Sequence, residues 1–423
     1  MRRLAPLALA ALALLAAGCG GESFAGKEVS GPVASWGDKG VVALHNFEAS
    51  RILEDGRGRV IALGIYHNGY AQVVRLEPDG SLDKSFGKRG IVRWPNSFQV
   101  NWLTGALLPN GDIALAGATG FGVLGGNDTN LVVAILDSSG KIVRSFAQNG
   151  YYGTARSSCL RAPAGIIPWG KAIVVTGARF CHTFRSPGSV VAIRLGLDGK
   201  PDRSFGKEGQ ILVTTVPGQT YPETPMLVLP KDRLLIATPA SSPGKIELVR
   251  LFADGARDQS FGHAGVATAS VSADAWTAHR YDLFRDRRGS LYFTGCNYGG
   301  TFLVRFNPNG SPHPFWFEER HLGAETSVER FGGAFGGGKV SGCAQFAQLH
   351  NREFVVAGGV VARLKPDGLV DPHYPAQPVV GWGKFSPDDL TISRDGTALV
   401  MLTNFKSGRW TTYLARYRQV KAA

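Results

Sequence analysis

The sequence predicts an all-β chain that folds as a seven-bladed β-propeller, with four antiparallel strands in each blade. Three observations support this prediction. A repeat returns along the whole chain, with its turn glycines 55 to 60 residues apart: Gly80, Gly140, Gly199, Gly255, Gly310 and Gly368. Short β-branched apolar segments lie between glycine-, proline- and asparagine-rich turns. Half-repeats that complement each other stand at the two ends of the chain.

Each repeat contains a tight turn, seen best in Glu77-Pro78-Asp79-Gly80. Proline at the second position and glycine at the fourth predict a type I turn followed by a glycine bulge. Such a turn places Arg75 opposite Asp83. The same pairing returns as Arg194 with Asp202, Arg250 with Asp258 and Arg363 with Asp371, and Arg305 faces His313. Because a functional site is rarely repeated in every unit, we interpret these as structural cross-strand pairs.

An aromatic residue follows each turn glycine by six positions. The six rings are Phe86, Phe146, Phe205, Phe261, Trp316 and Tyr374. A ring at one fixed place in every unit predicts packing between neighbouring sheets.

The second repeat shows the expected order of strands. The first strand is expected at Asn101–Leu108, the second at Ile113–Gly117, the third at Leu131–Leu136 and the fourth at Ile142–Ser145. No stretch has a convincing helical apolar period, so all four are read as strands.

The ends of the chain complement each other. Trp36 and Gly40 stand where Phe86 and Gly90 stand in the first full copy, and Arg416 stands where Arg75 does. We therefore predict that the N-terminal strand closes the last blade, which leaves no exposed sheet edge at the seam. The residue facing Arg416 would be Val33, so this blade would lack the charge pair.

The first 19 residues have the pattern of an export signal. Arg2 and Arg3 precede an apolar run that is too short to favour a spanning helix. The run ends in Ala16-Ala17-Gly18-Cys19, which resembles the bacterial lipobox, in which Cys19 would carry the lipid. We expect a signal peptide at residues 1–19, a tether at 20–30 and the propeller at 31–423. The protein would then be exported and held by its lipid on the outer side of the cytoplasmic membrane or at the cell envelope.

Four cysteines remain after Cys19, a number that can pair completely in an exported protein. We favour Cys159 with Cys181 and Cys296 with Cys343, although three connectivities are possible. No C-x-x-C spacing indicates a redox or zinc site.

The chain is basic, with a formal net charge of +13 that falls to +11 once Arg2 and Arg3 are lost with the signal peptide. This excess of positive charge favours anionic partners such as lipid headgroups, an acidic envelope polymer or a surface protein. The alternative is that the charged residues only form an ordinary solvated surface. No nucleic-acid motif is present, and we expect a monomer.

The connections between second and third strands vary most in length, and variable loops on a rigid scaffold often carry binding residues. The candidate binding-face residues on these connections are Tyr66, His67, Asn127, Asp128, Arg179, His182, Arg185, Asn297, Tyr298, Lys406 and Trp410. The alternative is that they are ordinary solvated loop residues.

Two glycine motifs match known patterns by letter only. Gly120–Gly125 fits G-x-G-x-x-G and Gly333–Lys339 fits G-x-x-x-x-G-K, but no helix follows either one, as phosphate binding requires. The nine histidines form no H-E-x-x-H motif, and no G-x-S-x-G motif occurs. We therefore assign no catalytic residue, no metal site and no cofactor.

The pattern R-[LF]-x-x-D-G-x-x-D-x-S-F-G-x-x-G resembles the delta-60 repeat family of bacterial exported proteins. Residues 73–90, 190–209 and 248–265 match it best, and the copies that begin at Leu131, Phe302 and Val361 match in part. The resemblance implies a β-propeller-like fold and no established chemistry.

Three functions fit these features. The leading hypothesis is a lipid-anchored, non-catalytic binding or scaffolding module for an envelope polymer or a protein. The competing hypothesis is an exported propeller hydrolase or lyase that acts on carbohydrate, for which ionisable groups should converge in a deep axial pocket. The third is a purely structural envelope protein.

Overall fold

The structure, a computed structural model, describes residues 32–66, 69–94, 100–119, 131–154, 159–179, 188–216, 223–240, 242, 244–271, 280–297, 300–313, 317–318, 344–349, 353–358, 360–365, 371, 373–374, 377–379 and 387–418. The expected signal peptide and tether, and with them Cys19, lie outside these residues. A search of the described part of the chain for a helix long and apolar enough to cross a membrane found none.

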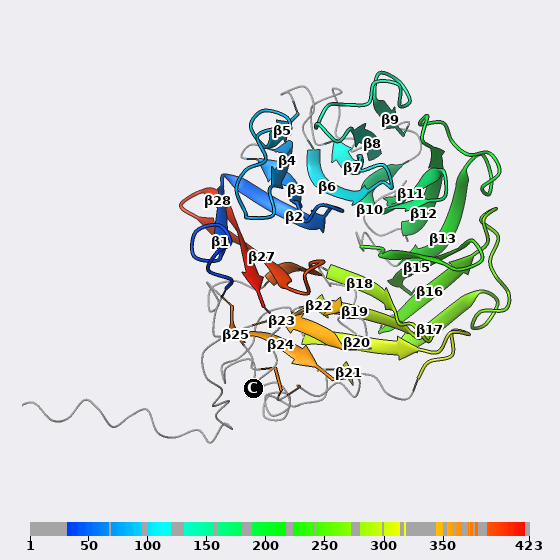
Figure 1. Cartoon of the computed structure of the whole chain (residues 1–423). Helices are drawn as coiled ribbons and strands as arrows, with labels where there is room; N and C mark the ends of the chain where they lie inside the picture. Colours follow the sequence, from blue (N-terminus) through cyan, green and yellow to red (C-terminus); the bar gives the residue numbers. More distant parts are fainter. Residues whose placement is uncertain are drawn as a thin grey trace, which may run out of the picture.

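Seven four-stranded antiparallel sheets surround a central axis, as Figure 1 shows, so the predicted all-β, seven-bladed propeller is confirmed. Blade 1 contains β2 (Phe47–Glu54), β3 (Val60–Tyr66), β4 (Tyr70–Leu76) and β5 (Ile91–Arg93). Blade 2 contains β6 (Val100–Leu107), β7 (Ile113–Thr119), β8 (Leu131–Leu136) and β9 (Tyr151–Gly153). Blade 3 contains β10 (Leu160–Trp169), β11 (Ala172–Arg179), β12 (Gly188–Gly196) and β13 (Gln210–Val216).

The remaining blades follow in chain order. Blade 4 contains β14 (Met226–Leu229), β15 (Arg233–Pro239), β16 (Lys245–Leu251) and β17 (Val266–Ser270). Blade 5 contains β18 (Arg280–Arg285), β19 (Leu291–Asn297), β20 (Gly300–Phe306) and β21 (Phe317–Glu318). Blade 6 contains β22 (Gln345–Gln348), β23 (Phe354–Ala357), β24 (Val360–Leu364) and β25 (Gln377–Pro378). Blade 7 contains β26 (Pro387–Ile392), β27 (Ala398–Lys406), β28 (Arg409–Tyr417) and β1 (Val41–His45).

The hydrophobic core lies between neighbouring blades. Residues of blade 1 such as Leu63 and Val73 share one buried cluster with Leu103 and Leu115 of blade 2. The middle strands are almost continuously apolar because both of their faces are covered, as in β3 and β15. Each sheet therefore depends on the next sheet to bury its surface.

The N-terminal strand closes the ring, as predicted. β1 pairs with β28 from Val41 opposite Ala415 to His45 opposite Thr411. The Val33 N–H donates to the Arg416 carbonyl at 2.6 Å, which confirms the predicted position of Val33. Arg416 instead pairs with Glu54 of blade 1, at 3.3 Å between Nη2 and Oε2.

The repeated turn has the predicted register. The Gly80 N–H donates to the Glu77 carbonyl at 2.9 Å, and the Asp83 N–H donates to the Arg75 carbonyl at 3.0 Å. Gly80 has a φ of +88°, which glycine adopts without strain. The Asp83 carboxylate then accepts hydrogen bonds from the Ser85 N–H and hydroxyl, at 2.9 and 2.6 Å, which explains the D-x-S part of the repeat.

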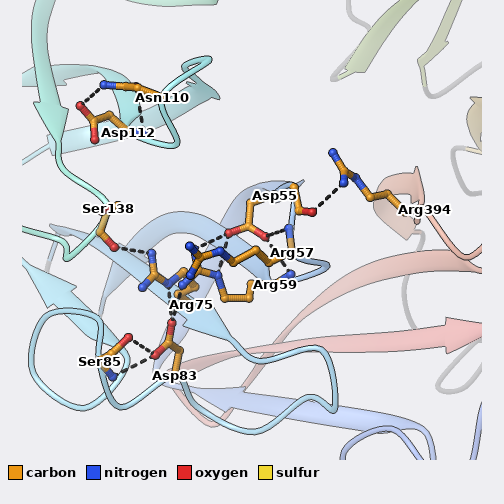
Figure 2. A network of polar contacts seen from close by, with 11 residues as sticks. Asp55, Arg57, Arg59, Arg75, Asp83, Ser85, Asn110, Asp112, Ser138 and Arg394 are labelled. Atoms are coloured by element: carbon orange, nitrogen blue, oxygen red, sulfur yellow. Dashed lines mark hydrogen bonds and ion pairs between the residues drawn. The ribbon is translucent and has the colours of Figure 1, made fainter.

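The repeat arginine of blade 1 joins this blade to blade 2, as Figure 2 shows for Arg75. Its Nε lies 2.7 Å from Asp83, its Nη1 donates to the carbonyl of Ser138 in blade 2 at 2.7 Å, and its guanidinium lies 4.2 Å from the centre of the Phe86 ring. The same cross-blade hydrogen bond links Arg194 to Ala253 and Arg250 to Pro308.

The repeat aromatic packs between blades in the first four copies, as predicted, whereas Tyr374 is half-buried and Trp316 lies outside the described residues. Phe86, Phe146, Phe205 and Phe261 are fully buried. A Cβ on Gly140 of blade 2 would lie 2.9 Å from the Phe86 ring. We call the arginine, the aspartate, the aromatic ring and the next turn glycine the inter-blade latch. The predicted pairs form ion pairs in blades 1, 3 and 4, whereas in blade 6 the Arg363 guanidinium binds Glu353 and Asp371 binds His373.

The predicted fourth strand of blade 2, Ile142–Ser145, is wrong. Ile142 makes only an isolated bridge with Leu136, and the fourth strand is β9, which follows the turn at Gly150. The chain turns away directly after the bridge, where the Phe146 N–H donates to the Val143 carbonyl at 3.0 Å. The same order holds in blade 1, where Leu82 forms the bridge and β5 forms the strand.

Candidate functional site

The innermost strands of all seven blades line an axial cavity of about 620 Å³, to which β2, β6, β10, β14, β18, β22 and β26 contribute. This volume falls within the usual range of small-molecule sites, about 300–1,000 Å³. Because each first strand carries alternate side chains toward the axis, residues far apart in the sequence meet there.

Arg51 of β2 is the central charge of this cavity. Its Nη1 lies 3.6 Å from the Asp282 carboxylate on β18, and its Nε lies 4.0 Å from the Asp389 carboxylate on β26. Glu223, which precedes β14, also lines the cavity. One guanidinium and three carboxylates from four blades thus share one space. We call these four residues the axial cluster.

Irregular pairing in the first strands accompanies this arrangement. The register between β2 and β3 shifts between Ala49 and Arg51, and that between β26 and β27 shifts between Pro387 and Asp389. Such bulges re-aim the side chains that follow them. The Ile52 N–H donates to the Asp389 carboxylate at 2.8 Å, which ties blade 7 to blade 1.

Tyr281 fixes the other side of the cluster. Its ring is buried and stacks on Phe293 with 5.3 Å between ring centres. Its backbone N–H donates to the Glu223 carboxylate at 3.3 Å. Burial and the Glu223 charge raise the pKa of the Tyr281 phenol, so it stays protonated at neutral pH.

The electrostatics of the axial cluster are dominated by its acids. Burial lowers the pKa of Arg51, but Asp389, Asp282 and Glu223 outweigh this effect and raise it above its usual value. The Arg51 side chain is 34% exposed, against 14% for Asp282 and 4% for Asp389. The exposed third of Arg51 faces the cavity. With one cation and three acids in the axial cluster, and Glu54 of the lining paired with Arg416, the cavity favours positive charge.

The axial cluster can bind hydrogen-bond donors. Carboxylates paired with a guanidinium act as acceptors, and groups such as sugar hydroxyls or an ammonium supply the donors. Among the described residues, no group of three or more His, Cys, Asp or Glu has the arrangement needed to hold a metal ion.

The candidate binding-face residues that the structure describes lie at the ends of second strands or the starts of third strands, and they do not line the axial cavity. Tyr66 is half-buried beneath the Arg93 guanidinium, which lies 3.5 Å from the ring centre. The Arg179 Nη2 donates to Gln210 at 3.3 Å. Trp410 packs against Phe405 with 4.8 Å between ring centres, and Lys406 is exposed beside them.

Asn297 ends β19 opposite Gly300, and only its backbone is described. Outside the described residues lie His67, Asn127, Asp128, His182, Arg185 and Tyr298. Of the cysteines, Cys159 is half-buried and Cys296 pairs with Arg280 in the sheet, while Cys181 and Cys343 lie outside the described residues, so the disulfides stay predictions.

The sequence reasoning missed the axial cluster. The available signal was a charged residue inside the apolar first strands, as in FEASRILE, YDLFR and PDDLTI. A charged side chain in the middle of an innermost strand faces either a neighbouring blade or the axis. Because burial of an unpaired charge between blades is costly, the axis is the expected direction.

Comparisons with known proteins agree with the fold. A family described as a domain of unknown function (DUF5122) beta-propeller matches residues 58–86. No curated protein matches the chain.

Several solved structures are similar at low identity. The polysaccharide lyase Uly1 is 11% identical over 88% of this chain and 90% of that one, with a TM-score of 0.50. An α-L-arabinofuranosidase, Arb93A from Fusarium graminearum, is 10% identical over 92% and 96%, with a TM-score of 0.44. An α-L-arabinanase from Penicillium chrysogenum is 10% identical over 87% and 93%, with a TM-score of 0.44. At these identities the likeness concerns the fold alone.

Proposed function

We propose that the protein is an exported, lipid-anchored β-propeller that binds a neutral or positively charged carbohydrate in its axial cavity. Export and anchoring rest on the leader sequence that ends at Cys19. Binding rests on one observation, the axial cluster of Arg51 with Asp282, Asp389 and Glu223 in a cavity of about 620 Å³.

The charge of the cavity selects among ligands. An anion that approaches Arg51 meets two nearby carboxylates, Asp282 and Asp389, which already neutralise the guanidinium. Hydroxyl groups and ammonium groups can donate to the same carboxylates. An acidic envelope polymer is therefore a poor ligand for the cavity, and an amino sugar is the best match.

The test compares three trisaccharides of similar size, one cationic, one neutral and one anionic. We expect the purified protein to bind a glucosamine trisaccharide most tightly, its N-acetylated counterpart less tightly, and a uronic acid trisaccharide not measurably, as followed by calorimetry. Asp282→Asn removes one acceptor charge and should weaken binding of the amino sugar about tenfold or more, because a charge-assisted hydrogen bond contributes roughly 1.5–3 kcal/mol.

Tyr66→Ala is the matched control, because Tyr66 lies outside the cavity and its loss should leave affinity unchanged. An unchanged affinity in Asp282→Asn, or equal binding of all three sugars, would contradict the axial assignment. Thermal unfolding of both variants reports whether either one is misfolded.

A second function is favoured by the paired acids. Glycosidases use two carboxylates on either side of the bond that breaks, and Asp282 and Asp389 both line this cavity from different blades. Convergence of ionisable groups on an axial pocket is also what an exported propeller hydrolase or lyase requires. Cleavage of the same trisaccharides, followed by NMR and lost in Asp282→Asn and in Asp389→Asn, would establish catalysis in place of binding.

A further inference from the structure

One end of the propeller carries the turns between first and second strands together with the repeat hairpins. In blade 1, Val60 pairs with both Glu54 and Leu76, so the turn at residues 55–59 and the hairpin that follows Leu76 lie at the same end of the sheet. Hydrogen bonds from Gly87 to Ser139 and from Gly206 to Asp254 place the hairpins of successive blades side by side. We call this end the turn face.

The turn face is rich in exposed cations. The turns around the axis present Arg57, Lys171, Lys231, Arg287 and Arg394, from five different blades. The hairpins farther from the axis add exposed lysines and arginines such as Lys88, Lys141 and Lys200. Exposed acids, including Asp232 and Asp395, are present but fewer: among the described residues of this face, exposed Lys and Arg outnumber exposed Asp and Glu by more than two to one.

The N-terminal segment enters the propeller on the same face. Gly37 donates its N–H to the carbonyl of Asp79 in the first repeat hairpin, at 2.8 Å, and Lys39 is exposed beside it. The described chain begins at Pro32, 13 positions after Cys19. At about 3.5 Å per residue, an extended segment of that length spans no more than about 45 Å. A lipid on Cys19 would therefore hold the turn face close to the membrane.

We propose that the turn face lies against an anionic lipid surface. The argument combines two independent features, the excess of exposed cations and the entry of the lipid-bearing segment on the same side. Each cation near an anionic membrane adds a modest, salt-sensitive attraction, and many such contacts sum. The opposite face, with Tyr66, Arg179 and Trp410, then points away from the membrane. The anchoring part of this proposal rests on lipidation of Cys19. The electrostatic part rests only on the exposed cations of the turn face.

The test separates the two faces by matched charge reversal. Residues 32–418 contain all seven closed blades, so a chain that starts at Gly20 keeps the fold and has no lipid of its own. It is mixed with vesicles of phosphatidylglycerol and phosphatidylcholine, or of phosphatidylcholine alone, and sedimented at low and high salt. We expect binding only to the anionic vesicles and release at high salt.

The decisive comparison uses two triple variants with the same change in net charge. Lys171→Glu, Lys231→Glu and Arg287→Glu alter the turn face, while Lys245→Glu, Lys406→Glu and Arg409→Glu alter the opposite face. The first set should lower the partition onto anionic vesicles by at least about tenfold, and the second set should change it little.

Equal losses in the two sets would mean that only net charge matters and would overturn the proposal. Binding to a soluble polyuronate without binding to vesicles would also overturn it, in favour of a polymer partner. The axial cavity lies apart from these substitutions, so sugar affinity measured on the same variants reports independently on the carbohydrate proposal.

Discussion

The repeat arginine is the residue that explains why the motif recurs. Arg75 forms an ion pair, covers an aromatic ring and donates to the next blade, and its side chain and that of Asp83 are 2% and 1% exposed. The equivalent Arg194 and Asp202 are 13% and 28% exposed, with 3.3 Å between Nε and Oδ2. The same letters in the repeat therefore contribute differently to stability in different blades.

We expect Arg75→Ala to destabilise the protein by about 2–3 kcal/mol, because it removes a charge-assisted hydrogen bond to the buried Asp83 and leaves that carboxylate only Arg59, at 3.2 Å, as a cationic partner. Arg194→Ala is the matched control and should cost only about 1–2 kcal/mol, because Asp202 remains accessible to water. Urea unfolding at neutral pH measures both free energies. Equal costs would show that burial of the pair does not determine its contribution.

The pH dependence provides a second readout of the same pair. Burial raises the pKa of Asp83, but hydrogen bonds from Ser85 and Arg75 outweigh it and lower the pKa to about 2. A carboxyl with a lowered pKa stabilises the fold above its unfolded pKa of about 3.9, and this contribution is lost as the pH falls toward 2. In Arg75→Ala the pKa of Asp83 rises, so the loss of stability between pH 4 and pH 2 should be smaller than in the unaltered protein.

At the scale of the element, the turn glycines have two separate functions. Gly140 and Gly111 both have positive φ, at +84° and +86°. A Cβ on Gly140 would lie 2.7 Å from Val92 and 2.9 Å from the Phe86 ring, whereas a Cβ on Gly111 would meet nothing within 4 Å. Both positions require left-handed backbone, but only Gly140 also requires space for the neighbouring blade.

Gly111→Ala should therefore cost about 1–2 kcal/mol, the cost of a left-handed alanine. Gly140→Ala carries that cost and overpacks the latch, which typically adds about 1–3 kcal/mol. The difference between the two unfolding free energies isolates the contact between blades. If both variants lose the same stability, the glycine is kept for its backbone conformation alone.

The repeat was sufficient to predict the number of blades and the register of the turn, but not the position of the fourth strand within the blade. Pro78, Gly80 and Asp83 specify their turn locally, so the register of Arg75 opposite Asp83 could be predicted. The fourth strand was misplaced in blade 2 because Ile142 has the composition of a strand residue, yet it makes only a single bridge. The chain instead turns after Val143, and the Ala147 N–H donates to the Asp198 carbonyl of blade 3 at 2.8 Å, a tertiary contact that the alternation pattern does not contain.

The axial cluster could not be predicted for a different reason. Arg51 and Asp389 are brought together by closure of the ring, and Asp282 reaches them from a third blade. Bulges before Arg51 and before Asp389 accompany this geometry. The repeated turn pattern does not include the first strands, so no repeat position marks these residues. The sequence therefore indicated the loops as the binding face, whereas in the structure the charged residues of the axial cluster converge on the axis.

At the scale of the whole molecule, the seam is where the ring depends on contacts between the two ends of the chain. Thr412 of β28 accepts the Ala49 N–H at 3.0 Å and donates to the Phe47 carbonyl at 2.8 Å. Trp36 is buried against blade 1, and β1 covers the outer edge of β28. A propeller of repeats without such closure would expose an unpaired strand edge, which is a template for association with another chain.

Removal of β1 tests whether closure holds the ring together. A chain that starts at Asn46 lacks Trp36 and β1, whereas a chain that starts at Pro32 keeps both and is the matched control. We expect the shorter chain to unfold at lower urea concentration, because loss of a buried tryptophan alone costs roughly 3–5 kcal/mol. It should also self-associate through the exposed β28 edge, as measured by light scattering across a range of protein concentrations. If it stays monomeric with an unchanged unfolding midpoint, the interfaces between the other blades are sufficient to hold the ring, and the N-terminal strand serves only to carry the chain toward Cys19.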